Sequence, residues 1–308
     1  MESFLATCIV AATPLIFATV GELITEKCGH LNLGVEGMML LGAVMGFMAA
    51  LNTGNGYIAL LAAGAAGGGG ALIYAILTVT LRANQVVTGL TLTIFGTGFA
   101  SFVGQDMLGA IVPATVGSFF VKRSLPVLGD IPFFGTVFFK QDVFVYLAYL
   151  VVIVAALYLY KTKPGLNLRA VGENTSSADA SGINVAFYKY AHVLMGGALC
   201  GLGGAYLSLV RVPIWQSDVV NGRGWIAVAL VIFASWNPIK AFLGAILFGG
   251  LSILGLRLQA MGISVSQYLV DMIPYLATII IVIISSHKKG KEKQPPMDLG
   301  NSYFREER

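Results

Sequence analysis

Charge is scarce in this sequence: charged residues make up 11% of its 308 residues, whereas a typical globular domain carries about 25%. A soluble protein of this length needs a polar surface, and too few charged side chains are present to build one. The shortage excludes a soluble enzyme and a disordered chain. Hydrophobic residues reach 56%, and 38 residues are glycine. This is the composition of a polytopic membrane protein with closely packed helices.

Cysteine and the common catalytic motifs are also scarce. Cys8, Cys28 and Cys200 have no metal-ligand spacing and cannot all pair, so we interpret them as small apolar fillers. The sequence has no Walker A, HExxH, CxxC or GxSxG pattern, and its three histidines are scattered. The net charge of +4 leaves no basic face for nucleic acid. We therefore expect no catalytic residue, no metal and no cofactor in this chain, which moves or binds something instead.

Long apolar segments dominate the sequence. A transmembrane helix needs about 20 apolar residues, so we predict an all-α fold, a polytopic transmembrane helical bundle of about 8–10 spans. The seventh segment is short and ends in Trp236-Asn237-Pro238, which favours a re-entrant half-helix. The segments are 3–21, 33–51, 57–81, 84–103, 143–160, 190–210, 225–236, 241–256 and 267–286.

The basic residues predict the orientation in the membrane. If all nine segments cross and the N-terminus is outside, 13 Lys and Arg side chains fall on the cytoplasmic side and six fall outside. The positive-inside rule then gives an outside N-terminus and a cytoplasmic C-terminus. The first segment lacks a basic flank and a clear cleavage site, so we interpret it as a retained span. The six outside residues are Lys122, Arg123, Lys140, Arg211, Arg223 and Arg257.

Small residues recur four positions apart within the predicted spans, as in Gly42/Gly46, Gly64/Gly68 and Gly197/Gly201. Such pairs let helix backbones approach closely. We expect most of them to pack helices within one chain, although any one of them could also serve a subunit interface.

The most informative polar stretch is residues 161–189. Pro164-Gly165 predicts the end of the preceding helix, and Ser176-x-x-Asp179 has the form of a capping box. Gly182 suits a left-handed position after a helix. Together they predict a short helix near 177–181 outside the bilayer. Such a helix can dock in a groove of another protein or simply connect two spans.

Four stretches resemble one family, the branched-chain amino acid, ribose and nucleoside permeases of ABC importers. The 161–189 loop, with RAVGEN at 169–174 and GIN at 182–184, looks like the family's cytoplasmic coupling loop. Residues 29–39 (GHLNLGVEGMM), 82–90 (RANQVVTGL) and 222–227 (GRGWIA) also fit. Residues 82–90 resemble the version of the motif found in permeases that pair with purine-nucleoside-binding lipoproteins. Thr175 departs from the family, where we would expect proline, so the start of the coupling helix could differ.

The resemblance covers about residues 1–286 and implies the transmembrane permease subunit of an ATP-driven nucleoside importer. It implies a second homologous permease, an ABC ATPase with tandem nucleotide-binding domains that carries ATP and Mg, and an extracytoplasmic substrate-binding lipoprotein. It also implies a multi-pass location in the cytoplasmic (inner) membrane. The coupling residues that it suggests are Arg169, Gly172, Glu173, Asn174, Ala178, Asp179 and Gly182.

Ionisable groups inside a membrane are functional candidates by default. Glu36 falls near the start of the second span, and Asp271 falls within the last. Because a nucleoside is neutral and an ATP-driven pump needs no coupling ion, we favour structural or gating roles. Glu36 is then expected to pair with helix N-terminal amides or Lys27, and Asp271 with a neighbouring helix. Substrate contact is the alternative.

Uncharged polar and aromatic side chains are the candidates for the substrate pathway. Amides and hydroxyls could bond a ribose or a base edge, and aromatic rings could stack on a base. The alternatives are interhelical hydrogen bonds, a helix start and an interfacial aromatic belt. The candidates are Asn32, Asn84, Gln85, Thr88, Trp215, Trp225 and Tyr268.

The sequence therefore predicts a permease domain over residues 1–286 and a basic cytoplasmic tail over 287–308. The lysines of the tail would attract anionic membrane lipid, and Pro295-Pro296 predicts disorder beyond them. The same architecture carrying a simple sugar such as ribose, or a branched-chain amino acid, remains open. An ion-coupled secondary transporter and a membrane protein without transport are the rivals from other classes.

Overall fold

The computed structural model describes residues 2–260 and 294–305, together with residues 266, 269, 272–273, 275–277, 279–280 and 283. Six helices in this part are long and apolar enough to cross a membrane. They confirm six of the predicted spans, and most of their ends lie within a few residues of the predicted ends. The six spans are α1 (Glu2–Lys27), α2 (Val35–Thr53), α3 (Gly56–Ala75) with η1 (Ile76–Thr80), α4 (Gln85–Gly104) with η2 (Gln105–Met107), α7 (Val143–Lys161) and α10 (Val185–Tyr206) with η4 (Leu207–Arg211).

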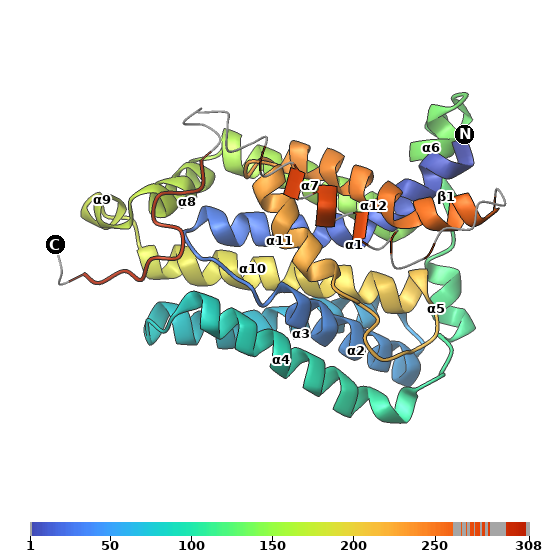
Figure 1. The fold of residues 1–308 in the computed structure, drawn as a ribbon, viewed down its shortest axis with the longest axis horizontal. Helices are drawn as coiled ribbons and strands as arrows, with labels where there is room; N and C mark the ends of the chain where they lie inside the picture. The colour runs from blue at the N-terminus through green and yellow to red at the C-terminus, as the bar shows by residue number, and fades with distance from the viewer. Residues whose placement is uncertain are drawn as a thin grey trace.

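Helix α10 runs through the middle of the bundle and packs against α1, α2 and α3 (Figure 1). Glycines make these contacts close. A Cβ on Gly42 would collide with the backbone of Gly201, and one on Gly197 with Ala71. The prediction that these glycines pack helices within the chain is confirmed, because each contact lies between two of its own helices.

The end of the bundle next to the N-terminus carries a small cap between α4 and α7 (Figure 1). Two short strands pair antiparallel there, with Arg123 opposite Gln141. Its elements are α5 (Ala114–Phe119), β1 (Arg123–Ser124), η3 (Leu128–Asp130), α6 (Phe134–Phe138) and β2 (Lys140–Gln141).

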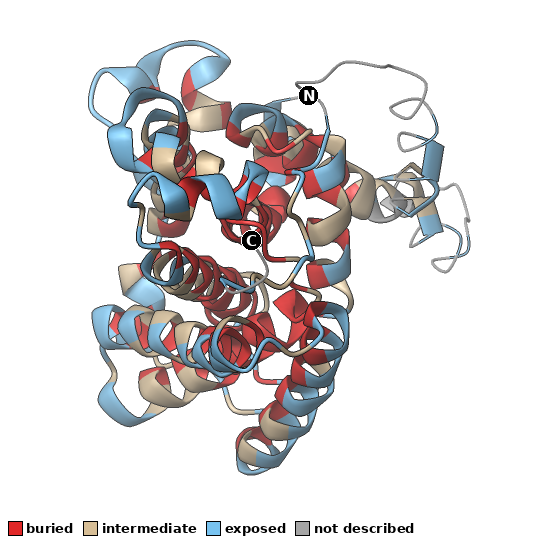
Figure 2. Ribbon diagram, turned by 90° about the vertical axis from the view of Figure 1, so that its left-hand side faces the viewer, coloured by how far each residue is buried: buried red, intermediate tan, exposed pale blue. Residues whose placement is uncertain are grey.

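The opposite end carries two further helices, α8 (Lys163–Glu173) and α9 (Thr175–Ala180). The C-terminal segment, residues 294–305, lies beside them (Figure 1). We call this the α9 end. Figure 2 looks onto it and shows buried residues along the inner faces of the bundle helices and exposed residues on α8 and α9. The N-terminus and the C-terminal segment thus lie at opposite ends.

The seventh predicted segment forms α11 (Arg223–Phe233), which has 11 residues. At 1.5 Å per residue it is about 16 Å long, too short to cross a bilayer. Residues 234–237 then turn the chain into α12 (Pro238–Ala260). The expectation of a half-helix here is confirmed. The ninth predicted segment, 267–286, lies mostly outside the described residues.

Candidate functional site

Helices α8 and α9 form the surface that the sequence assigns to a soluble partner. The inner face of α9 rests on its own chain, since Ala178 is buried in a cluster with Val171 and Val185, and Tyr303 of the C-terminal segment packs against this cluster. The outer face is free for contact within the part of the molecule that is described. Its exposed residues are Ser176, Ser177 and Ala180.

The short helix is confirmed, but its predicted capping box is wrong. The Asn174 side chain caps α9, accepting the Ser177 amide at 2.8 Å. The helix therefore begins two residues before the predicted range. Asp179 turns away from the helix start, because its carboxylate is bound by the C-terminal segment. Gly182 follows α9 with φ +82°, the left-handed position that we expected.

Helix α8 was missed in the sequence. Thr162 accepts the Gly165 amide at 3.1 Å and caps it, and Pro164 lies in its first turn, where proline is well tolerated. Pro164-Gly165, which the sequence analysis takes as a helix end, therefore also lies at a helix start. Thr162, as a possible N-cap residue, was the sequence feature that could have predicted α8. At its other end Gly172 packs on the backbone of Lys27, at the end of α1. Helix α8 thus rests directly on the first span.

The predicted disorder beyond Pro295-Pro296 is not what the structure shows for residues 294–305, which cross the α9 end in contact with three distant parts of the chain. The Asp298 amide donates to the Gly172 carbonyl at 3.0 Å, and the Gly300 amide donates to the Gly29 carbonyl at 3.1 Å. The Asp298 carboxylate accepts the Thr175 amide at 2.6 Å. These hydrogen bonds join residues far apart in the sequence, so Pro295-Pro296 and the local sequence around them do not predict them.

The coupling candidates divide between interior and surface. Arg169 stacks its guanidinium over Tyr160, 5.5 Å from the ring centroid, and Gly172 and Ala178 are buried, whereas Glu173 and Asn174 are exposed. Asp179 accepts the Tyr303 hydroxyl at 2.7 Å and pairs with Arg305 at 3.1 Å. This carboxylate therefore holds the chain's own end in the described structure.

A second polar centre lies where α11 begins inside the bundle. The Glu36 carboxylate, 6% exposed, accepts the Gly222 amide at 2.8 Å and the Gly224 amide at 2.6 Å. A carboxylate at a helix N-terminus satisfies free amides and opposes the positive end of the helix dipole. Glu36 therefore fastens α2 to the start of α11, in agreement with the structural role that we favoured. Arg223 is the first residue of α11.

The other end of α11 is also held by a buried carboxylate. The Trp236 indole nitrogen donates to Glu26 in the last turn of α1. Glu22, one turn earlier, accepts the Asn32 amide at 3.0 Å. Both glutamates escaped the sequence analysis because we ended the first span at residue 21, whereas α1 continues to Lys27. The spacing of four between them is the signal that could have found them.

The polar pathway candidates act as parts of the scaffold. Asn84 caps α4 by accepting the Val87 amide at 3.0 Å, and Thr88 donates to the Asn84 carbonyl at 2.8 Å. Asn32 is buried and accepts the Gly34 amide at 2.9 Å. Gln85 accepts the Leu31 amide at 2.8 Å and donates to the Asn301 carbonyl at 3.3 Å. These four side chains lie toward the α9 end.

The aromatic candidates are not gathered with them. Trp215 is buried beside Phe47, with ring centroids 5.4 Å apart, near the end opposite α9. Trp225 is 36% exposed on α11. Tyr268 and Asp271 lie outside the described residues. The described structure therefore does not bring the predicted pathway residues into one cavity.

The comparison with protein families decides the class. A model described as the permease component of the branched-chain amino acid transport system matches residues 4–283. The chain belongs to this family. It is a multi-pass membrane protein and a permease subunit of an ABC transporter, in line with the resemblance seen in the sequence.

Three relatives are similar to most of this chain. A nucleoside ABC transporter permease of Lactococcus lactis subsp. cremoris is 33% identical over 99% of this chain and 98% of that protein. A guanosine ABC transporter permease of Bacillus subtilis is 34% identical over 88% of both. A protein of Haloferax volcanii, assigned as a glucose ABC transporter permease, is 42% identical over 82% of this chain and 77% of that protein.

Proposed function

We propose that this chain is the transmembrane permease of an ATP-driven importer that carries nucleosides across the cytoplasmic membrane. The observation that carries the proposal is the match to the nucleoside permease of Lactococcus lactis subsp. cremoris along 99% of the chain. The guanosine permease of Bacillus subtilis supports it. The sequence around residues 82–90 agrees with the same group.

A simple sugar is the second candidate substrate. The relative assigned as a glucose permease has the higher identity, 42%, but over 82% of this chain. Glucose and a nucleoside's ribose share a ring rich in hydroxyls, so a pathway that bonds hydroxyl groups weakly would suit either. Substrate choice would then be made by the external binding lipoprotein.

The partners follow from the same proposal. ATP and Mg would be bound by an ABC ATPase with tandem nucleotide-binding domains, because this sequence has no Walker A pattern. A second homologous permease would complete the pathway. The C-terminus would be cytoplasmic and the N-terminus outside, which puts the α9 end, with Lys27, Arg82, Arg169 and Lys189 nearby, on the positive side.

The geometry suggests how ATPase movement would reach the pathway. The ATPase would press on the exposed face of α9. Helix α8 would pass the movement through Gly172 to the end of α1. From there the bond between Glu26 and Trp236 reaches the turn between α11 and α12, and α11 carries the displacement to Glu36.

Uptake of labelled uridine, guanosine, ribose and glucose in a strain lacking this gene, with and without the gene restored, tests the proposal. We expect only nucleoside uptake to depend on the chain and to stop when ATP is depleted. Loss of sugar uptake alone would overturn the nucleoside assignment. Uptake that survives ATP depletion and follows a proton or sodium gradient would overturn the ATP-driven mechanism.

A further inference from the structure

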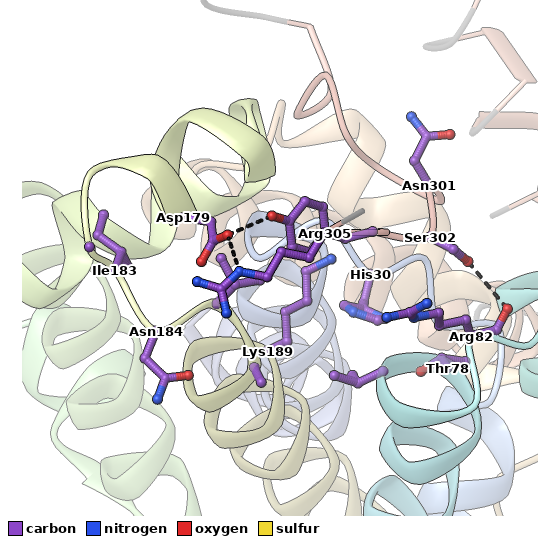
Figure 3. Close-up of a pocket in the computed structure, with 15 residues that line it drawn as sticks. His30, Thr78, Arg82, Asp179, Ile183, Asn184, Lys189, Asn301, Ser302 and Arg305 are labelled. Carbon is purple, nitrogen blue, oxygen red and sulfur yellow. Dashed lines mark hydrogen bonds and ion pairs between the residues drawn. The ribbon is translucent and has the colours of Figure 1, made fainter. Parts of the chain in front are cut away.

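A polar cavity lies at the α9 end, beneath the C-terminal segment. It measures about 470 Å³, within the range of small-ligand pockets. Its walls come from the end of α3 with η1, the loop after α9, the start of α10 and residues 301–305 (Figure 3). Of the coupling candidates only Asp179 and Gly182 line it, and no residue of the Glu36 centre does.

Basic side chains outnumber acidic ones around this cavity. Among the described residues its lining has three basic side chains, Lys189, Arg82 and Arg305, and one carboxylate, Asp179. Asp179 is already used, since it pairs with Arg305 at 3.1 Å and accepts the Tyr303 hydroxyl at 2.7 Å. The cavity therefore keeps an excess of positive charge.

Lys189 and Arg82 are the two basic side chains that remain, and Lys189 is the buried one. It is 3% exposed, and the described residues offer its ammonium neither an ion pair nor a hydrogen bond. The nearby Asp298 carboxylate attracts it but is already bonded to the Thr175 amide. Buried charges in proteins are normally paired. An ammonium that lines a cavity without a partner marks a place for an anion.

His30 points to the same conclusion independently. It is 1% exposed, lines the cavity, and neither of its ring nitrogens has a hydrogen-bond partner in the described part of the chain. Burial and the charge of Lys189 hold the pKa of His30 well below its usual value. A neutral imidazole still donates one N–H, so His30 can complete the coordination of an oxyanion beside Lys189 (Figure 3).

Helix α10 adds a third contribution. Its first two residues, Val185 and Ala186, line the cavity, and the helix has 22 residues. The positive end of its dipole and its free amides favour an anion at this point. Arg82 closes the other wall, with its guanidinium 4.7 Å from the Phe304 ring centroid.

We propose that this cavity binds a phosphate group, held by Lys189, His30, Arg82 and the start of α10. The volume exceeds that of inorganic phosphate, so the natural ligand is a small phosphorylated metabolite. Because Tyr303 and Arg305 form the roof, an occupied cavity fastens the C-terminal segment to α9. The ligand thereby links the metabolic state of the cell to the surface that meets the ATPase.

Inorganic phosphate added to the purified full-length protein in lipid-free detergent tests the proposal by thermal stability and by calorimetry. We expect saturable stabilisation at millimolar phosphate that chloride at equal ionic strength does not reproduce. Lys189→Met should weaken the affinity about tenfold, since it removes a charge-assisted bond. Lys122→Gln, exposed at the opposite end, should leave it unchanged.

A second variant guards against misfolding of Lys189→Met. Arg82 is exposed at the surface, so Arg82→Gln should fold normally and weaken phosphate binding about threefold. Nanodiscs of phosphatidic acid and of phosphatidylcholine separate the two sources of a phosphate group. Stabilisation by phosphatidic acid alone, lost in both variants, would support the site with a lipid headgroup as its ligand. Equal stabilisation of wild type and Arg82→Gln by phosphate would overturn the proposal. So would the absence of stabilisation beyond that of chloride, both with inorganic phosphate and with phosphatidic acid.

Discussion

Replacing Glu36 with glutamine tests whether this carboxylate is a fastener of α11. Glutamine keeps the size of the side chain but offers one acceptor oxygen where the carboxylate offers two. In the structure both oxygens are used, one by the Gly222 amide and one by the Gly224 amide. The substitution therefore leaves one buried amide facing an NH2 group.

The expected loss follows from these two bonds. A buried donor left without its acceptor costs about 1–3 kcal/mol, and a charge-assisted bond reduced to a neutral one loses about 1 kcal/mol more. We expect Glu36→Gln to lower the free energy of unfolding by about 2–4 kcal/mol. For a chain of this size that corresponds to a melting temperature lower by roughly 5 °C.

The assay compares melting in detergent with uptake in membranes for the same variants. Glu2→Gln is the matched control, because Glu2 is exposed at the start of α1 and surface changes stay within about 0.5 kcal/mol. We expect Glu36→Gln to lose stability and uptake together. Unchanged melting with abolished uptake would refute the structural role and favour contact with the substrate or with a coupled ion.

Three further substitutions test the packing, the coupling helix and the C-terminal segment. Gly42→Ala should lower the free energy of unfolding by about 1–3 kcal/mol, because the new Cβ meets the backbone of α10. Gly69→Ala, where nothing lies within 4 Å, should melt like wild type. Equal melting temperatures for the two variants would contradict close helix packing. Asn174→Ala should remove the cap of α9, which lowers stability by about 1 kcal/mol, and should reduce substrate-stimulated ATP hydrolysis in the assembled transporter. Ser176→Ala, at an exposed position, should do neither. Hydrolysis at the wild-type rate in both variants would count against α9 as the coupling helix. Asp179→Asn should release the C-terminal segment and speed its removal in limited proteolysis several-fold, and an unchanged cleavage rate would show that other bonds suffice to hold it.

The spans and the short coupling helix were predictable because their signals are local. A run of about twenty apolar residues, a left-handed glycine at Gly182 and small residues four apart each specify structure within one helix or at its end. Partners distant in sequence were not predictable. Asp179 looked like a helix cap because a cap needs only its neighbours, yet Tyr303 binds it from 124 positions away.

The same limit applies to the candidate pathway residues. Gln85 and Asn84 have the chemistry to bind a hydroxyl, but the first bonds the Leu31 amide and the second caps its own helix. His30 and Lys189 were not predicted as site residues, because no local sequence pattern marks either of them. Only the fold brings them to one cavity.

The bonds of the C-terminal segment also bear on how the protein is made. Residues 294–305 leave the ribosome after every preceding helix has been offered to the membrane. Until then the Gly29 and Gly172 carbonyls lack the Gly300 and Asp298 amides that they accept in the finished chain. Residues 294–305 therefore complete the α9 end only after the helices before them have been made, and a product that stops short of them exposes an unfinished surface that quality-control proteases can recognise.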